Sequence, residues 1–369
     1  MIHVVQVLTD TNIGGAGKYL LNYLQNFDRS SFRVTVILPE NSQLAEPVKA
    51  CDGVTLEEVP YMADQSYNKH CVAVLKELFI KIKPDILHTH ACLSARIAGR
   101  KSKVPVILAT RHCIEPLSRG IKALIKGFAN TFLCDYYIAV SQAVVQNLTD
   151  SGIKPDKIKL VNNGVVPVRT ISEDECRTLR EAYHIQEDDT VFGVFARLEP
   201  VKGHKYFIKA ARQYLKEESK AKFLIVGNGS LESVLKEQVA RYGLEEHVIF
   251  TGFVPDTAPL LNITDITVIS SESEAMSLAI LEAMSLGKPS IATAVGGNTE
   301  LIENDISGLL TGYADSASLA SAMLRLANNP TLSQKLGQCA KEQYERNFTV
   351  ERMVSRLEEL YREVLRNDH

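Results

Sequence analysis

Residues 266–293 read ITVISSESEAMSLAILEAMSLGKPSIAT, and the pattern in this segment indicates the fold class most clearly. The apolar run 266–270 has the length of a strand and ends in a polar loop. Apolar residues at helical spacing begin near Ser277, and the Gly-Lys-Pro sequence at 287–289 ends that pattern as a helix C-terminus does. A second apolar run, 289–293, follows at once. Strand, helix and strand in this order predict a βαβ unit with two parallel strands.

The same alternation of short apolar runs and helical patterns continues along the chain. Helical patterns lie between most of the runs, for example at 67–83 and 142–151, and two more, at 332–347 and 350–367, end the chain. Strands that alternate with helices predict mainly parallel sheets covered by helices on both faces. The other expected strands are 2–8, 32–38, 85–90, 105–110, 136–141 and 157–162 in the first half, and 190–196, 222–227 and 248–253 in the second.

The chain divides into two doubly wound α/β domains. A polar, acidic stretch around 171–189 interrupts the alternation, and 369 residues exceed what one hydrophobic core usually supports. We therefore expect a hinge near 165–189. The prediction is a first domain over 1–168, a second over 169–348 and a closing helix over 349–369 that packs back across the domain boundary. Because ligands bind outside the carboxyl ends of parallel strands, two facing domains would hold one ligand in the cleft between them.

The composition is that of an ordinary globular protein, with 45% hydrophobic and 23% charged residues. A formal charge of −3 lacks the basic excess expected of a nucleic-acid binder. Seven cysteines form no CxxC pair and no zinc-like spacing, which indicates reduced, mostly buried thiols and a cytoplasmic location. The first residues, MIHVVQVLTD, do not resemble a signal peptide, and no apolar run reaches the length of a membrane span.

Two cations follow the expected strand 190–196. Arg197 and Lys202 lie five residues apart in the sequence RLEPVKG, at the carboxyl end of a strand and the start of a helix. A guanidinium can engage phosphate oxygens in pairs, and an ammonium acts as a point charge. A solvated loop with two surface cations is the alternative. The position favours a pyrophosphate site about as strongly as that alternative.

Two carboxylates flank the helix start near Ser277. Glu274 lies in the loop and Glu282 about two turns into the helix, and the free amides near Ser277 and Leu278 form a helix N-terminus that can bind an anion. The segment thus offers one carboxylate for sugar hydroxyls, amides for phosphate and a second carboxylate for a ribose diol. Taken alone, both glutamates are more simply surface charges; together with Arg197 and Lys202 they favour a nucleotide-sugar site.

The first half carries two weaker signals. Glycines at 14–17, between the first strand and the first helix, allow a ligand to approach the backbone, although they do not form the GxGxxG pattern of dinucleotide binding. His112 follows the expected strand 105–110, where a side chain can reach a ligand. His88 and His90 end the strand before it. They have no visible third ligand, so we interpret them as structural or acceptor-side residues in preference to a metal site.

The chain resembles the retaining glycosyltransferases of family 4, which have the GT-B fold of two Rossmann-like domains facing across a cleft. The resemblance covers nearly the whole chain and is strongest from about 190 to 310. Its order and spacing are more specific than any single motif. The matching pieces are 196–203 (ARLEPVKG), 224–229 (LIVGNG), 251–256 (TGFVPD), the E-x7-E pair Glu274 and Glu282, 293–300 (TAVGGNTE) and 304–310 (NDISGLL).

The resemblance implies a role for each candidate residue. Arg197 and Lys202 would bind the donor diphosphate, the amides of Ser277 and Leu278 a phosphate, and Glu282 the ribose. The backbone at Val254 would meet the base, and Gly15 would face the phosphates from the other domain. His112 and Glu274, the candidate catalytic residues, would contact the transferred sugar. The family implies a UDP-sugar donor by frequency, and a saccharide or lipid-linked acceptor in cell-surface polysaccharide synthesis.

The chain contains no Asp-x-Asp sequence that would hold a divalent cation against the diphosphate. We therefore expect no metal and no cofactor, with Arg197, Lys202 and helix amides meeting the leaving-group charge. A sugar-nucleotide epimerase of the same fold and a non-catalytic donor-binding relative are the alternative functions. The basic, amphipathic segment 118–133 is a further candidate for peripheral contact with the inner face of a membrane, although a core-facing helix explains the pattern more simply.

Overall fold

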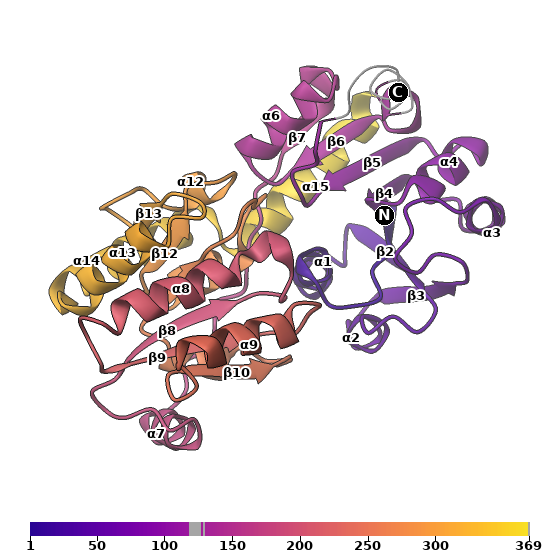
Figure 1. Ribbon diagram of the computed structural model, residues 1–369. Helices are drawn as coiled ribbons and strands as arrows, with labels where there is room; N and C mark the ends of the chain where they lie inside the picture. Colours follow the sequence, from indigo (N-terminus) through magenta and orange to yellow (C-terminus); the bar gives the residue numbers. More distant parts are fainter. Residues whose placement is uncertain (118–126, 128–129, 368–369) are drawn as a thin grey trace. The chain divides into compact units, whose positions relative to one another are not determined.

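The computed structural model describes residues 1–117, 127 and 130–367, and the chain separates into two compact units. Unit 1 comprises Met1–Val165 together with Val350–His369, and unit 2 comprises Val166–Thr349 (Figure 1). The chain thus passes between the units at 165–166 and again at 349–350. Each unit is a parallel sheet with helices on both faces.

Unit 1 is built on a parallel sheet with the strand order β3-β2-β1-β4-β5-β6-β7. The strands are β1 (Ile2–Leu8), β2 (Phe32–Pro39), β3 (Val54–Val59), β4 (Ile86–His90), β5 (Val106–Arg111), β6 (Tyr136–Ala139) and β7 (Ile158–Leu160). The helices are α1 (Gly15–Asn26), α2 (Ala45–Lys49), α3 (Lys69–Ile82), α4 (Leu93–Lys101), α6 (Gln142–Asp150), the 3-10 turn η1 (Pro155–Lys157) and α15 (Val350–Asn367).

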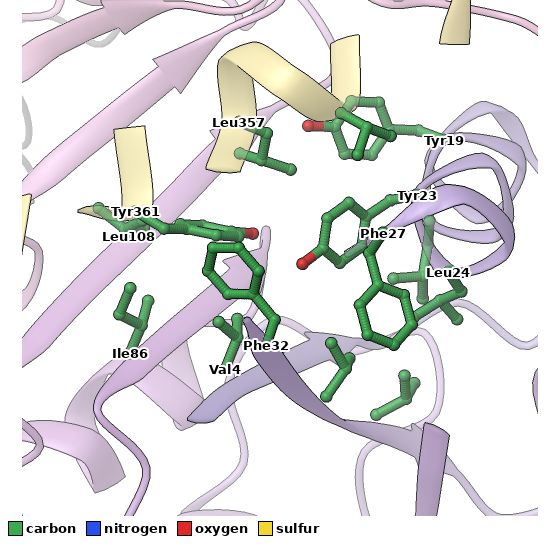
Figure 2. Packing of buried hydrophobic residues seen from close by; sticks show 14 of the residues in the cluster. Val4, Tyr19, Tyr23, Leu24, Phe27, Phe32, Ile86, Leu108, Leu357 and Tyr361 are labelled. Carbon is green, nitrogen blue, oxygen red and sulfur yellow. The ribbon is translucent and has the colours of Figure 1, made fainter. Parts of the chain in front are cut away.

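The core of unit 1 has two layers because successive strand residues point to opposite faces of the sheet. Val4 of β1 faces a cluster built with α1, α2 and α15, whereas Val5 faces a cluster built with α3 and α4. In Figure 2 the rings of Tyr361, Tyr23 and Phe32 meet in the first of these clusters. Tyr361 comes from the last helix, so the end of the chain completes the core of the first unit.

Unit 2 repeats the arrangement with the strand order β10-β9-β8-β11-β12-β13, again all parallel. Its strands are β8 (Thr190–Phe195), β9 (Ala221–Val226), β10 (Val248–Gly252), β11 (Ile266–Ile269), β12 (Ser290–Thr293) and β13 (Leu309–Thr311). Its helices are α7 (Glu173–Ala182), the 3-10 turn η2 (Pro200–Lys202), α8 (His204–Tyr214), α9 (Glu232–Tyr242), α10 (Ala258–Ile263), α11 (Leu278–Ser285), α12 (Asn298–Leu301), α13 (Ser316–Ala327) and α14 (Pro330–Asn347).

The stretch 171–189 differs from the sequence expectation. Helix α7 occupies much of it and begins with a capping box, in which Ser172 and Glu175 each accept a hydrogen bond from the other residue's backbone amide. Its apolar residues pack with those of α10 in a cluster on one face of the sheet of unit 2. The acidic residues that suggested an interruption lie in the first turn and on the exposed face of this helix.

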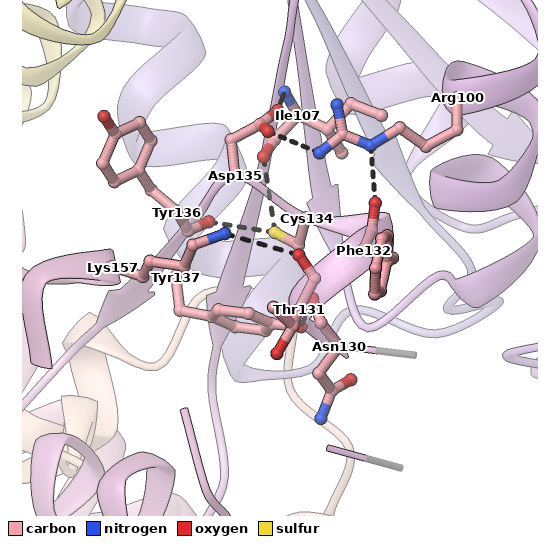
Figure 3. Close-up of polar contacts among 10 residues, drawn as sticks. All are labelled: Arg100, Ile107, Asn130, Thr131, Phe132, Cys134, Asp135, Tyr136, Tyr137 and Lys157. Carbon is pink, nitrogen blue, oxygen red and sulfur yellow. Dashed lines mark hydrogen bonds and ion pairs between the residues drawn. The ribbon is translucent and has the colours of Figure 1, made fainter. Parts of the chain in front are cut away.

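Polar contacts fix the segment that leads into β6 (Figure 3). Asp135 accepts hydrogen bonds from Arg100 of α4, at 2.5 Å, and from the amide of Ile107 in β5, at 2.8 Å. Arg100 Nε also donates to the carbonyl of Phe132 at 2.8 Å. These bonds join α4 to the beginnings of β5 and β6.

The segment 118–133 was the candidate for membrane contact. Most of it, including its three cations, lies outside the described residues. Across the ranges that are described, no helix is long and apolar enough to cross a membrane. All seven cysteines are within those ranges and are free thiols; four of them are buried.

Candidate donor site and histidine network

The candidate donor residues of unit 2 gather where the strand order reverses. Strand β8 lies between β9 and β11, so the chain leaves it in one direction across the sheet and returns on its other side. In open α/β sheets this switch point is where ligands bind, outside the carboxyl ends of the strands. Arg197 and Lys202 follow β8, and Glu274 and Ser277 follow β11. The topology therefore brings together two segments that are about 75 residues apart in the sequence.

The two loops are joined by backbone contacts. The amide of Glu272 donates to the carbonyl of Val201 at 2.8 Å, and Ser270 Oγ donates to the carbonyl of Lys202 at 3.0 Å. Gly203 makes this approach possible: its φ is +66°, and a Cβ atom there would lie 2.0 Å from the carbonyl oxygen of Ser270. The loops consequently hold each other in a defined geometry.

Lys202 and Glu274 form an ion pair across these loops. Lys202 Nζ lies 2.7 Å from Glu274 Oε1, and the side chains are only 23% and 11% exposed. Ser271 Oγ donates to the same carboxylate oxygen at 2.6 Å. An ammonium has three N–H donors, so one bond to Glu274 leaves Lys202 able to bind a phosphate as well. The sequence suggested Lys202 and Glu274 as site residues, but it did not predict their ion pair or the hydrogen bond from Ser271.

Arg197 differs from Lys202 in its surroundings. It is exposed and, among the described residues, takes part in no ion pair or hydrogen bond through its side chain. The loop that carries Arg197 is held to the loop after β9, because the amide of Leu198 donates to the carbonyl of Asn228 at 2.8 Å. The neighbouring His204 is buried, and this burial lowers its pKa to about 4, so it adds no charge at neutral pH.

Helix α11 begins as the sequence predicts, with Ser277 as its N-cap. The Ser277 hydroxyl accepts a hydrogen bond from the amide of Ile280 at 3.4 Å, which leaves the earlier amides, including that of Leu278, pointing out of the helix end. Glu282 is the fifth residue of the helix and is half-buried. The expectation of two turns was wrong: Glu282 is five residues after the N-cap Ser277, which at about 3.6 residues per turn is only about 1.4 turns, so it lies closer to the anion site.

Val254 follows β10, on the far side of β9 from β8. Neighbouring strands lie about 4.8 Å apart, so the edge from β10 to β8 measures roughly 10 Å. A nucleotide laid along it would have its base near Val254 and its phosphates near β8. The side chain of Val254 packs at the margin of the α7–α10 cluster, which leaves its backbone as the group for recognition.

In unit 1 the equivalent switch point lies between β1 and β4. Gly15 is the first residue of α1, directly after β1, and is exposed. The N-cap is Gly14, which has no side chain and so makes no side-chain capping hydrogen bond. The amides at this helix end form a second potential anion site.

His112 lies just after β5, is half-buried, and is hydrogen-bonded to a network of buried side chains. His90 Nδ1 is 2.8 Å from His112 Nε2, and His90 Nε2 is 3.0 Å from Gln6 Oε1. The Tyr19 ring packs edge-on against the His112 ring, with centroids 5.0 Å apart. Burial lowers the pKa of His112 to about 4, so the ring is neutral at physiological pH.

His88 belongs to the same network but lies entirely within the core. Its Nδ1 is 2.7 Å from the Tyr361 hydroxyl, and its Nε2 is 2.6 Å from Thr110 Oγ1. Burial lowers its pKa to about 3. Among the described residues, no group of three or more His, Cys, Asp or Glu side chains is arranged to hold a metal ion.

Comparison with known proteins agrees with this architecture. The chain matches the model of the glycosyl transferases group 1 over residues 176–343 and that of glycosyltransferase family 4 over residues 13–169. The first range contains every donor-site candidate of unit 2, and the second contains Gly15 and His112. Together the two matches cover most of the chain.

Two curated relatives span similar lengths. The chain is 27% identical over 326 residues to the N-acetyl-alpha-D-glucosaminyl L-malate synthase of Bacillus anthracis, covering 85% of this chain and 84% of that protein. It is 28% identical over 314 residues to the UDP-Gal:alpha-D-GlcNAc-diphosphoundecaprenol alpha-1,3-galactosyltransferase of Escherichia coli, covering 79% of each. The crystal structure of Anabaena HepE in complex with UDP and glucose superposes with a TM-score of 0.87 at 21% identity, covering 98% of this chain and 99% of that one.

Two parallel Rossmann-like sheets with this strand order, and the superposition on the Anabaena structure, define the GT-B fold, and the matches to the two family models make the chain a glycosyltransferase. Within that class, the chain is a family 4-like glycosyltransferase, matched by the group 1 model in unit 2 and by the family 4 model in unit 1.

Proposed function

We propose that this glycosyltransferase is retaining and metal-independent, and that it uses a UDP-sugar. It moves a hexosyl or N-acetylhexosaminyl unit to a saccharide or lipid-linked acceptor in the synthesis of cell-surface glycans. The observation that carries the proposal is the cluster at the switch point of unit 2. There, two cations and the carboxylate of Glu274 lie on two loops that hydrogen bonds join, and the second loop leads into the N-terminus of α11, which carries Glu282.

Each group of the cluster suits one part of a nucleotide sugar. Arg197 and Lys202 bind the diphosphate, and the amides of Ser277 and Leu278 bind one of its phosphates at the N-terminus of α11. Glu282 accepts hydrogen bonds from the ribose hydroxyls. The backbone at Val254 meets the base. Glu274, already hydrogen-bonded to Ser271 and Lys202, offers its remaining acceptor positions to hydroxyls of the transferred sugar.

Unit 1 contributes two groups in this proposal. Gly15, at the uncapped start of α1, contacts the donor phosphates, and His112 contacts the transferred sugar. A neutral His112 is suited to this place, since an imidazolium would repel the positive charge that develops at the anomeric carbon in the transition state. Its contribution is a hydrogen bond and not a charge.

The chemistry follows from these groups. The bond between the anomeric carbon and the phosphate oxygen breaks through an oxocarbenium-like state, and the departing diphosphate gathers negative charge. Fixed cations and helix amides can stabilise that charge without a divalent cation, so we propose that no metal or cofactor is needed. The acceptor hydroxyl attacks on the face that the phosphate leaves and transfers its proton to a phosphate oxygen, which retains the anomeric configuration.

The choice of donor and acceptor draws on the relatives. The Escherichia coli relative is named for a UDP-linked galactose and a diphosphoundecaprenol acceptor, and the Anabaena structure contains UDP and glucose. The Bacillus anthracis relative, whose name gives L-malate as the acceptor, favours a small non-saccharide acceptor instead. A single fold thus serves different acceptors, and donor specificity is the part to test first.

A panel of UDP-glucose, UDP-galactose, their N-acetyl forms and GDP-mannose, with EDTA present, tests the proposal. We expect slow hydrolysis of one UDP-sugar, and proton NMR should show the α-anomer as the first sugar released from the α-linked donor. An initial β-anomer would refute retention, and dependence on added metal would refute metal-independence. Conversion of the UDP-sugar into its epimer would identify an epimerase, and protection against melting without hydrolysis or transfer would identify a donor-binding relative.

A further inference from the structure

Three histidines of unit 1, His88, His90 and His112, belong to a continuous chain of hydrogen bonds that begins on the last helix. Tyr361 of α15 is fully buried, and its hydroxyl lies 2.8 Å from Gln6 Nε2 and 2.7 Å from His88 Nδ1. From Gln6 the chain continues to His90 and then to His112. Residues from β1, β4, β5 and α15 are therefore linked in one network.

The direction of each bond follows from the amide of Gln6. Its Nε2 donates to the Tyr361 hydroxyl, so its Oε1 faces His90 and can only accept. His90 Nε2 therefore carries the hydrogen. Because a neutral imidazole has one N–H, His90 Nδ1 is an acceptor, and it receives the hydrogen of His112 Nε2. His112 Nδ1 is then left with a lone pair.

The second branch agrees with this direction. The Tyr361 oxygen accepts from Gln6, so its own hydrogen is donated to His88 Nδ1, and His88 Nε2–H donates to Thr110 Oγ1. The rings are neutral, as the argument requires, because burial lowers the pKa of His88 and of His112 and holds that of His90 well below its usual value. Each hydrogen bond of the network thus has one donor and one acceptor, and no two of these assignments contradict each other.

We propose that Gln6 and Tyr361 are positioning residues that hold His112 in its Nε2–H tautomer and present Nδ1 as an acceptor to a hydroxyl of the transferred sugar. This inference rests on the proposed role of His112. The network fixes the tautomer through His90, and the ring of Tyr19 limits rotation of the His112 ring. A sugar hydroxyl that donates to Nδ1 is selected, and a group that can only accept is rejected.

Tyr23 provides a matched control. Like Tyr361, it is a fully buried tyrosine of the same core, and the two ring centroids are 6.2 Å apart (Figure 2). Its hydroxyl, however, has no hydrogen-bond partner among the described residues. Tyr23→Phe and Tyr361→Phe therefore remove the same atom from the same core, and only the second change breaks the network.

The experiment reads the tautomer directly in the full-length protein. Histidine labelled with 15N shows by NMR which nitrogen of His112 carries hydrogen, the signals being assigned by their loss in His112→Gln. We expect Nε2–H with a bare Nδ1 in the wild type and in Tyr23→Phe, and a mixture of tautomers in Tyr361→Phe. Donor hydrolysis should slow about tenfold in Tyr361→Phe, the equivalent of one ordinary hydrogen bond, with UDP affinity unchanged. In Tyr23→Phe the rate should stay within about twofold of the wild type.

A hydrogen on Nδ1 of His112 in the wild type would overturn the inference, as would a Tyr361→Phe spectrum identical to that of Tyr23→Phe. The wild-type spectrum decides the direction of the chain even where a variant fails to fold. The spectrum is recorded without donor, so it also separates the two proposals. An Nε2–H tautomer in a protein that hydrolyses no nucleotide sugar would reject the proposed function and leave the network intact.

Discussion

At the scale of single residues, the two carboxylates of the donor segment are expected to behave differently. Glu282→Ala removes an acceptor for the ribose diol and should weaken UDP binding by about tenfold or more, as the loss of hydrogen bonds to a charged group does. Glu274→Gln keeps an oxygen that can accept from Ser271 while it releases Lys202 from its ion pair. UDP binding should be kept or strengthened there, and donor hydrolysis should fall. Calorimetry with UDP and a hydrolysis assay measure the two effects.

The control for this comparison is Lys202→Gln. It removes the ammonium that binds the phosphate, so it should weaken UDP binding, whereas Glu274→Gln frees that ammonium. Equal losses of UDP affinity in Glu274→Gln and Lys202→Gln would contradict the assignment of Glu274 to the sugar. An unchanged affinity in Glu282→Ala would remove Glu282 from the ribose site.

The sequence predicted which charged residues could form a donor site but not how they pair. Lys202 and Glu274 each stand out by position, whereas their ion pair depends on how closely two loops approach. His112 stood out because it directly follows a strand, and its partner His90 was interpreted only as structural or acceptor-side. Nothing in the sequence pattern singled out Gln6 or Tyr361 as parts of a site. Gln6 looks like any polar residue within a strand, and Tyr361 looks like an ordinary core residue on an apolar helix face. Contacts that depend on strand register cannot be read from local patterns.

At the scale of elements, the turn before α8 depends on a glycine for two separate reasons. Gly203 and Gly243 both have φ +66°, but a Cβ atom at Gly203 would collide with the Ser270 carbonyl, whereas Gly243 has open space. Gly203→Ala should therefore destabilise unit 2 by roughly 1–3 kcal/mol more than Gly243→Ala, which has only the backbone strain. It should also weaken UDP binding, because the loops carrying Lys202 and Glu274 must separate. Denaturant unfolding and calorimetry on both variants measure this, and equal effects would show that the loop contact is unimportant.

Element prediction was accurate for the central strands, and it missed the two edge strands β3 and β13 and the exposed helix α7. The central strands β1, β4, β8 and β11 were expected within one or two residues of their observed bounds. Strand β3 was missed because it lies at a sheet edge and carries Glu57 and Glu58. Strand β13, another edge strand of only three residues, was also missed, although the equally short edge strand β7 lies within the expected strand 157–162. Helix α7 has no fully buried residue, so its composition resembles that of a loop. Apolar periodicity weakens wherever an element is only partly buried.

At the scale of the whole molecule, the alternating pattern was enough to predict two doubly wound units, because parallel sheets impose it on every βαβ repeat. The return of the chain to unit 1 has a different origin. Helix α15 is strongly amphipathic, and its buried face joins the cluster formed by β1, β4 and α1. A sequence shows that such a face must be covered but not by which sheet.

This return leads to a prediction about how stability is distributed. Leu357 of α15 is fully buried in the core of unit 1, and its replacement by alanine should cost about 2–5 kcal/mol there. Unit 2 has a core of its own, and its clusters of described residues include none from α15. Hydrogen exchange should therefore show lost protection for amides of β1 and β4 in Leu357→Ala, with β8 and β11 unaffected. Arg356→Ala, on the exposed face of the same turn, is the control and should change neither. Equal losses in both sheets would mean that the two cores unfold as one cooperative block, although the chain connects them only at 165–166 and 349–350.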